Sequence, residues 1–140
     1  MLYEIKIKVA KEDEKGHLKE VKEHYILDAE THGEAEEIGY KLYGDNPHEK
    51  IDVFAVSRSQ IREIVNNKEE DKPFFMAVVT QLYIDETTEK EKELKYPMLV
   101  CAKDLTEANI FMVQYLKQGY TDMRLDAIKR TKILDYIPYE

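Results

Sequence analysis

The chain opens with a regular alternation of apolar and charged side chains. The apolar positions are Tyr3, Ile5, Ile7 and Val9. A period of two places them on one face of a β-strand and leaves the intervening glutamate and lysines on a wet face. A polar stretch around Gly16 predicts a hairpin loop, and a second strand is expected from about Val21 to Ala29.

A helix is predicted from Thr31 to about Tyr43, because Thr31 followed by Glu34 forms the pattern of a helix capping box. Its apolar residues recur at helical spacing, which predicts a buried stripe made of Ala35, Ile38 and Leu42. A third strand is expected over 51–57, with a continuation towards Val65.

The second half of the chain repeats this order of elements. The segment 74–79 (FFMAVV) is apolar on both faces, which is typical of a central strand or of one covered by another chain. Further strands are expected over 98–102 and 125–137. Asp104 followed by Glu107 marks the start of a second helix, which Gly119 ends. Its predicted buried stripe consists of Ala108, Phe111, Met112 and Tyr115.

The two halves align with each other at an offset of about 73 residues, with 25–43 lying over 98–116. We interpret this as an internal duplication, although any two strand-helix-strand units could align in this way. The predicted organisation is a first β-β-α-β repeat at 1–65, a linker at 66–73 and a second repeat at 74–140, together forming one compact domain.

The expected fold class is α+β. About six strands, mostly antiparallel, and two helices would form a two-layer sandwich with both helices on one side of the sheet. An amphipathic helix and a half-apolar sheet bury their apolar faces most simply against each other. A pseudo-two-fold axis would relate the two halves.

The net charge of −8 disfavours general affinity for nucleic acid. A local basic patch could override it, and the candidates are Lys129, Arg130 and Lys132. Aromatic residues on the predicted strands could stack on unpaired bases, but aromatic side chains favour strands for packing alone. Alternating basic residues on a strand also commonly form a solvated face.

Arg58 and Arg130 are the charged strand residues that are identical in both halves. Two arginines related by a two-fold axis could clamp a carboxylate or a phosphate. The alternative is that each braces its sheet by pairing with an acidic residue. We therefore carry Arg58, Arg130, Lys129 and Lys132 as candidate binding residues.

Sequence motifs for catalysis, cofactors and metals are absent: the chain has no Gly-rich phosphate loop, G-x-S-x-G elbow or H-E-x-x-H pair. Its four histidines all lie in the first half without metal-site spacing, and Cys101 sits in an apolar run typical of a buried strand. No apolar run reaches the length of a membrane span, and the N-terminus has no signal-peptide pattern. We expect a cytoplasmic protein without enzymatic activity, cofactor or metal.

Several segments resemble a known family. YEIKIKV, EHYILDAETHGEAEEI and FAVSRSQIREIV in the first half, and LYIDETTEKEKE, MLVCAKDLTEA and ILDYIPY in the second, are similar to the domain of unknown function 4494 family. The last segment carries a D-x-x-P motif at Asp135 and Pro138, whereas His32-Gly33 departs from the family pattern. The resemblance implies a small protein of Bacteroidetes or their phages. It implies no activity and supplies no catalytic residues.

The leading functional hypothesis is a non-enzymatic binding or protein-interaction module that either has a protein partner or associates with itself as a homodimer. The alternative is an accessory protein associated with single-stranded DNA or RNA, possible for a phage-related chain. An enzyme is the third reading, and it would need a polar pocket that these motifs do not indicate.

Overall fold

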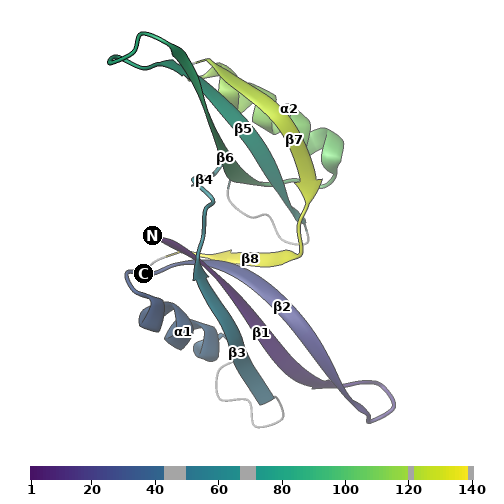
Figure 1. The fold of residues 1–140 in the computed structure, drawn as a ribbon. Helices are drawn as coiled ribbons and strands as arrows, with labels where there is room; N and C mark the ends of the chain where they lie inside the picture. The colour runs from purple at the N-terminus through teal and green to yellow at the C-terminus, as the bar shows by residue number, and fades with distance from the viewer. Residues whose placement is uncertain (43–49, 67–71, 120–121, 139–140) are drawn as a thin grey trace. The chain divides into compact units, whose positions relative to one another are not determined.

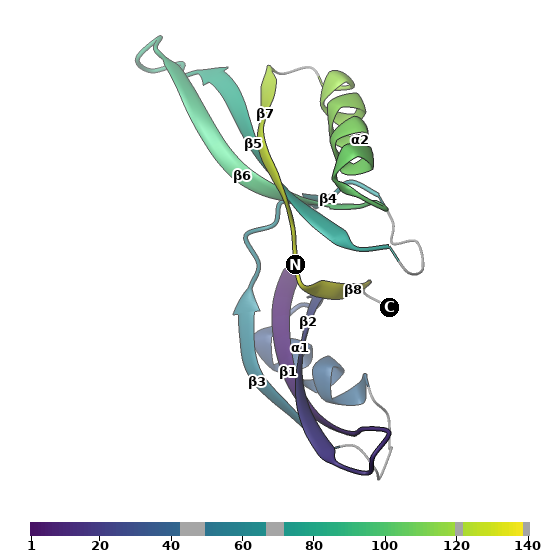
Figure 2. The ribbon, with the colours of Figure 1, turned by 90° about the vertical axis from the view of Figure 1, so that its right-hand side faces the viewer.

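The structure of the protein is a computed structural model that describes residues 1–42, 50–66, 72–119 and 122–138. It divides into two compact units. Unit 1 consists of 1–59 together with 132–140, and unit 2 consists of 60–131. Each unit is built from one four-stranded sheet and one helix (Figures 1 and 2).

Unit 1 contains a sheet with the strand order β3-β1-β2-β8. Its elements are β1 (Leu2–Glu12), β2 (Leu18–Asp28), α1 (His32–Lys41), β3 (Lys50–Arg58) and β8 (Ile133–Ile137). Strand β1 pairs antiparallel with β2 and β3, whereas β8 pairs parallel with β2. The apolar positions of the opening alternation are buried against α1, which confirms the predicted faces of this strand.

Unit 2 has the corresponding strand order β4-β6-β5-β7. Its elements are β4 (Glu63–Ile64), β5 (Phe74–Ile84), β6 (Glu91–Cys101), α2 (Leu105–Lys117) and β7 (Met123–Arg130). Strand β5 pairs antiparallel with β6 and β7, and β4 pairs parallel with β6. The doubly apolar segment at the start of β5 therefore lies between two strands, which confirms its prediction as a central strand.

Each unit has its own apolar core between the helix and one face of the sheet. In unit 1, Ile38 and Leu42 of the α1 segment pack on the buried residues of β1. Gly39 lets the helix approach closely, because a Cβ atom there would lie 3.1 Å from side-chain carbons of both Ile5 and Val53. In unit 2, Ala108 and Met112 of α2 are fully buried, as the predicted stripe requires.

Both helices begin as the capping signals predict. The Thr31 side chain accepts a hydrogen bond from the Glu34 backbone N–H at 3.1 Å, and the Asp104 side chain accepts one from the Glu107 N–H at 2.8 Å. Each bond satisfies one of the free N–H groups at a helix start. Helix α1 ends at Lys41, so it is shorter than predicted, and Tyr43 lies outside the described residues.

The α+β class is confirmed, but its arrangement differs from the expected single sheet with both helices on one side. The structure has two sheets, each with one helix. The expected long strands at 51–65 and 125–137 are each split in two. The first piece of each, β3 or β7, stays in the sheet of its own half, whereas the second piece, β4 or β8, pairs with β6 or β2 of the other half, which gives eight strands instead of about six.

The compact units consequently differ in their boundaries from the halves expected at 1–65 and 74–140. The chain passes from unit 1 to unit 2 after Ser59 and returns after Thr131. Of the predicted linker at 66–73, residues 67–71 lie outside the described part of the structure.

Candidate functional site

Arg58 and Arg130 lie at corresponding places in the two sheets. Arg58 is the last residue of β3 and lies opposite Tyr3 of β1. Arg130 is the last residue of β7 and lies opposite Phe75 of β5. Both side chains are exposed on the edge strand of their own unit. Their joint action as a clamp stays a prediction.

The basic segment at 129–132 is divided between the two units. Lys129 and Arg130 belong to β7 of unit 2, whereas Lys132 belongs to unit 1. Lys132 precedes Ile133, which pairs with His24 of β2. As a result, Lys132 lines a cavity of about 300 Å³ in unit 1 together with Lys6 and Lys22.

We call the surface formed by Lys6, Lys8, Lys22 and Lys132 the basic sheet face. Lys6 and Lys8 occupy the polar positions of the opening alternation, which the sequence identified only as a solvated face. Lys8 lies directly opposite Lys22 in the antiparallel register of β1 and β2. This grouping depends on strand pairing, so residue spacing along the chain could not reveal it.

His24 lies beside the basic sheet face, opposite Lys6. Its Nε2 is 3.1 Å from Oε1 of Glu4. Burial lowers the pKa of His24; the Glu4 carboxylate opposes this shift, and the charge of Lys6 adds to it. The imidazole is therefore biased towards its neutral form, and the lysines supply the positive charge of this face.

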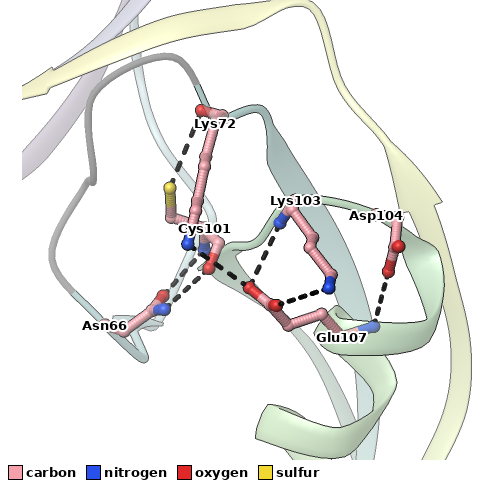
Figure 3. Close-up of polar contacts among 6 residues, drawn as sticks. All are labelled: Asn66, Lys72, Cys101, Lys103, Asp104 and Glu107. Carbon is pink, nitrogen blue, oxygen red and sulfur yellow. Dashed lines mark hydrogen bonds and ion pairs between the residues drawn. The ribbon is translucent and has the colours of Figure 1, made fainter.

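A second polar cluster surrounds the start of α2 (Figure 3). The Glu107 carboxylate accepts a hydrogen bond from the Lys103 backbone N–H at 3.3 Å. It also lies 3.7 Å from Nζ of Lys72 and 3.9 Å from Nζ of Lys103. With Asp104 capping the helix, these contacts fix the entry of the chain into α2, and we interpret the cluster as structural.

Asn66 joins the same region to β6 through a pair of short hydrogen bonds (Figure 3). Its side-chain nitrogen donates to the Cys101 carbonyl, and its side-chain oxygen accepts from the Cys101 N–H, both at 2.7 Å. The side-chain amide thereby continues the parallel pairing of β4 with β6. Cys101 is 1% exposed, so its thiol is inaccessible to a large substrate.

Helix α2 carries a second apolar face that points away from the core. It consists of Ile110 and Val113, whose side chains are 49% and 36% exposed. We call these two residues the apolar helix face. Leu105 is 53% exposed, but it lies two turns before Met112 on the same side of α2 and lines the groove against β7. The opposite side of α2 already buries Ala108 and Met112, so the fold of unit 2 does not account for this outer face.

Helix α1 differs from α2 at the positions that correspond to the apolar helix face. At the repeat offset, the positions of the apolar helix face correspond to Glu37 and Tyr40 of α1. Of these two, Glu37 is charged and forms an exposed ion pair with Lys41 at 2.9 Å. A helix in the same place of the same type of unit can thus carry a charged residue where α2 has Ile110, so the fold does not require an apolar residue there.

A groove of about 400 Å³ runs between α2 and the edge strand β7. Its lining residues are Leu105, Thr106 and Asn109 of α2 and residues 125–128 of β7. An irregularity in the pairing of β5 with β7 lets the Asp126 carboxylate accept hydrogen bonds from Thr80 and, at 2.7 Å, from Nε of Arg124. These bonds lower the pKa of Asp126 and hold its negative charge at the groove.

A further cavity of about 390 Å³ lies at the other end of α2. Arg62 stacks on the Tyr96 ring at 4.4 Å from its centroid, and the Tyr96 hydroxyl donates to the sulfur of Met123 at 3.6 Å. The hydrogen bond from the Tyr115 hydroxyl to Glu63, followed by burial, raises the pKa of Tyr115 to about 12. The polar groups of this cavity are thus largely satisfied by one another.

Within residues 1–42, 50–66, 72–119 and 122–138, no group of three or more His, Cys, Asp or Glu side chains is placed to hold a metal ion. The three described histidines contact Asp13, Glu4 and the Val56 carbonyl, and the fourth, His48, lies outside the described residues. A search of the described helices finds none with the length and apolar character that crossing a membrane requires.

Comparison with known proteins identifies the family. The model of the domain of unknown function DUF4494 matches residues 1–139. The chain belongs to the DUF4494 family. This result confirms the resemblance seen in the sequence, whereas the taxonomic source that it implies stays a prediction. Neither curated proteins nor solved structures gave a match, so any function of this DUF4494 protein must be argued from its geometry.

Proposed function

We propose that this protein is a non-enzymatic interaction module that binds a second copy of itself through the apolar helix face of α2. The observation that carries the proposal is the exposure of Ile110 and Val113 on a helix whose core-facing side is already buried. Contiguous exposed apolar residues commonly mark protein-interaction sites. Removing them from water provides a driving force of about 25 cal/mol per Å² of apolar surface.

A second copy is a suitable partner because the surface is complementary to itself. In a two-fold interface the same patch is used by both subunits, so apolar residues meet apolar residues. Helix α2 carries Asp104 and Glu107 at its start and Lys117 in its last turn. Antiparallel packing of two α2 helices would therefore place Lys117 of one copy near the acidic first turn of the other.

Sedimentation equilibrium of the full chain, with Ile110→Lys and Val113→Lys as interface variants, tests this proposal. The wild-type protein should form a dimer, and each lysine should shift the equilibrium to the monomer because a charge cannot be buried without a partner. Tyr40→Lys is the matched control, since Tyr40 occupies the position on α1 that corresponds to Val113 and is 40% exposed. A wild-type protein that stays monomeric at millimolar concentration would contradict the proposal.

The alternative function is association with single-stranded nucleic acid, and one observation favours it. Phe54 is exposed beside the basic sheet face, where a base could stack on its ring. The net charge of −8 opposes the approach of a polyanionic strand. A gel shift with single-stranded DNA at low and moderate salt tests this alternative, and the absence of binding at both would remove it.

A further inference from the structure

We propose that the basic sheet face of unit 1 binds a small phosphorylated ligand that carries a planar ring, a ligand of the mononucleotide class. This site is separate from the apolar helix face and does not depend on self-association. The two halves of such a ligand require different surroundings, namely positive charge for the phosphate and a flat apolar surface for the ring. The cavity beside β1 and β2 offers both.

The positive charge comes from three different segments of unit 1. Lys6 on β1, Lys22 on β2 and Lys132 before β8 line one cavity of about 300 Å³. Glu23 also lines it, but this carboxylate is engaged, because it lies 3.1 Å from Nζ of Lys11 and accepts a hydrogen bond from the Tyr25 hydroxyl at 2.7 Å. The volume is near the lower end of the range for ligand pockets and suits a small molecule.

The lysines of the basic sheet face are not neutralised by acidic partners. Among the residues that the structure describes, Lys6, Lys8, Lys22 and Lys132 make no ion pair with a carboxylate, although the protein has an excess of acidic residues. The nearby Glu4 carboxylate contacts His24 instead, with its Oε1 3.1 Å from Nε2 of the imidazole. Asp52 lies opposite Lys8 on the side away from β2, so it leaves Lys22 unneutralised.

The pairing of Lys8 with Lys22 carries a physical cost. These residues lie directly opposite each other in the antiparallel ladder. Like charges at such positions destabilise a sheet, whereas opposite charges stabilise it. A phosphate bound between the two ammonium groups would replace their repulsion with attraction to a shared anion, and charge-assisted hydrogen bonds from both groups would hold it.

The planar surface is supplied by Phe54. An irregularity in the pairing of β1 with β3 falls at this residue, and its ring is 40% exposed on the wall of the cavity. Nζ of Lys8 lies 4.9 Å from the ring centroid. This ammonium group lies over the ring, so a ligand ring that stacks on Phe54 would take its place, and the ligand's phosphate could reach Lys6, Lys22 and Lys132.

The charge of the protein favours a small ligand over a nucleic-acid strand. A strand must bring many phosphates to a molecule of net charge −8, whereas a mononucleotide brings one phosphate to a cavity that three lysines line. Three lysines around one small cavity can bind one phosphate, and the Phe54 ring can stack on one planar ring. The proposal therefore commits to the mononucleotide, and binding of a strand becomes an outcome of the test.

Isothermal titration calorimetry of the full chain with adenosine 5′-monophosphate tests the site. Inorganic phosphate and adenosine serve as the two separated parts of the probe. The nucleotide should bind at least tenfold more tightly than either part, because both halves of the site then act together. Absence of nucleotide binding at millimolar concentration, with a protein that is folded by circular dichroism, would overturn the proposal.

Two variants separate the roles within the site. Lys22→Gln should weaken nucleotide and phosphate binding about tenfold and should also raise the Tm of the ligand-free protein, because it removes the like-charge pair. Phe54→Leu should weaken nucleotide binding several-fold and leave phosphate binding unchanged. Lys19→Gln is the control, since Lys19 is exposed on the same strand and does not line the cavity, and it should leave nucleotide binding unchanged.

The variants also give results that would overturn the proposal. Nucleotide binding that survives Lys22→Gln and Phe54→Leu unchanged would place the ligand elsewhere. A twelve-nucleotide single strand that binds far more tightly than the mononucleotide, with a steep salt dependence, would show that a polyanion is the true ligand. Ile110→Lys should retain nucleotide binding, so failure of self-association and failure of this site are distinguishable.

Discussion

Replacement of Asn66 by alanine tests the attachment of the β4 segment to β6. The Asn66 side chain makes two hydrogen bonds of 2.7 Å with the backbone of Cys101, a residue that is 1% exposed. Each bond contributes about 1 kcal/mol net, and a buried N–H or C=O left without a partner costs about 1–3 kcal/mol. We expect Asn66→Ala to lower the free energy of unfolding by about 2–4 kcal/mol, because it removes both hydrogen bonds and leaves the N–H and C=O of Cys101 without these partners.

Urea denaturation followed by far-UV circular dichroism measures this change. Asn109→Ala is the control, because Asn109 is exposed on α2, and it should shift stability by less than about 0.5 kcal/mol. Asn66→Asp provides a second check: at neutral pH its carboxylate would face the Cys101 carbonyl, whereas at low pH the protonated acid can donate a hydrogen bond again. A free energy of unfolding for Asn66→Ala within about 0.5 kcal/mol of the wild-type value would show that water replaces the hydrogen bonds of the side chain, and it would refute the predicted loss.

Three further predictions concern helix starts, pH and glycine positions. Thr31→Ala and Asp104→Ala should each cost about 1 kcal/mol in urea denaturation through loss of the cap, and equal stability with the wild type would count against it. The folded pKa of Tyr115 is about 12, whereas an unfolded tyrosine has a pKa of about 10, so its bond to Glu63 stabilises the protein below pH 10 and is lost as the pH rises towards 12. Tyr115→Phe should flatten this loss of stability, and an unchanged slope between wild type and variant would contradict the assignment. Gly33→Ala meets no atom within 4 Å and should raise Tm, whereas Gly39→Ala should gain less because its Cβ would lie 3.1 Å from Ile5 and Val53; the reverse order would contradict the packing.

Local signals in the sequence predicted the elements of each half well. The alternation from Tyr3 to Val9 identified both the first strand and its buried face, because a period of two has only one interpretation when one face is apolar. Thr31 and Asp104 located the helix starts, since a side-chain cap acts on N–H groups two or three residues away. Interactions of this kind lie within a few residues and can be found from spacing alone.

The pairing of the terminal strands could not be predicted in the same way. Residues 133–137 have a strand-like pattern, but the pattern does not state which sheet they join, and β8 pairs parallel with β2 more than a hundred positions earlier in the chain. The basic sheet face was missed for the same reason. Lys8 and Lys22 become neighbours only once the register of the hairpin is fixed, and Lys132 joins them only through β8.

The exchanged strands also bear on how two copies of this protein can associate. Each half of the chain contributes its last strand to the other unit: β4 follows β3 but pairs with β6, and β8 follows β7 but pairs with β2. Exchange of an identical element between two chains is a recognised route to dimers. If β8 of one copy paired with β2 of another, every described backbone pairing of that strand would be retained.

A dimer formed by such an exchange would behave differently from one formed through α2. Ile110→Lys and Val113→Lys would leave it intact, because neither residue takes part in the pairing of β8. Subunits would also exchange slowly between strand-exchanged dimers, because the pairing of β8 with β2 must break before the strand can leave. A dimer packed through the exposed helix faces can dissociate without any unfolding. Mixing two labelled populations of the wild-type dimer therefore discriminates the two: rapid exchange supports the apolar helix face, and exchange only under partly denaturing conditions would assign the association to the strands.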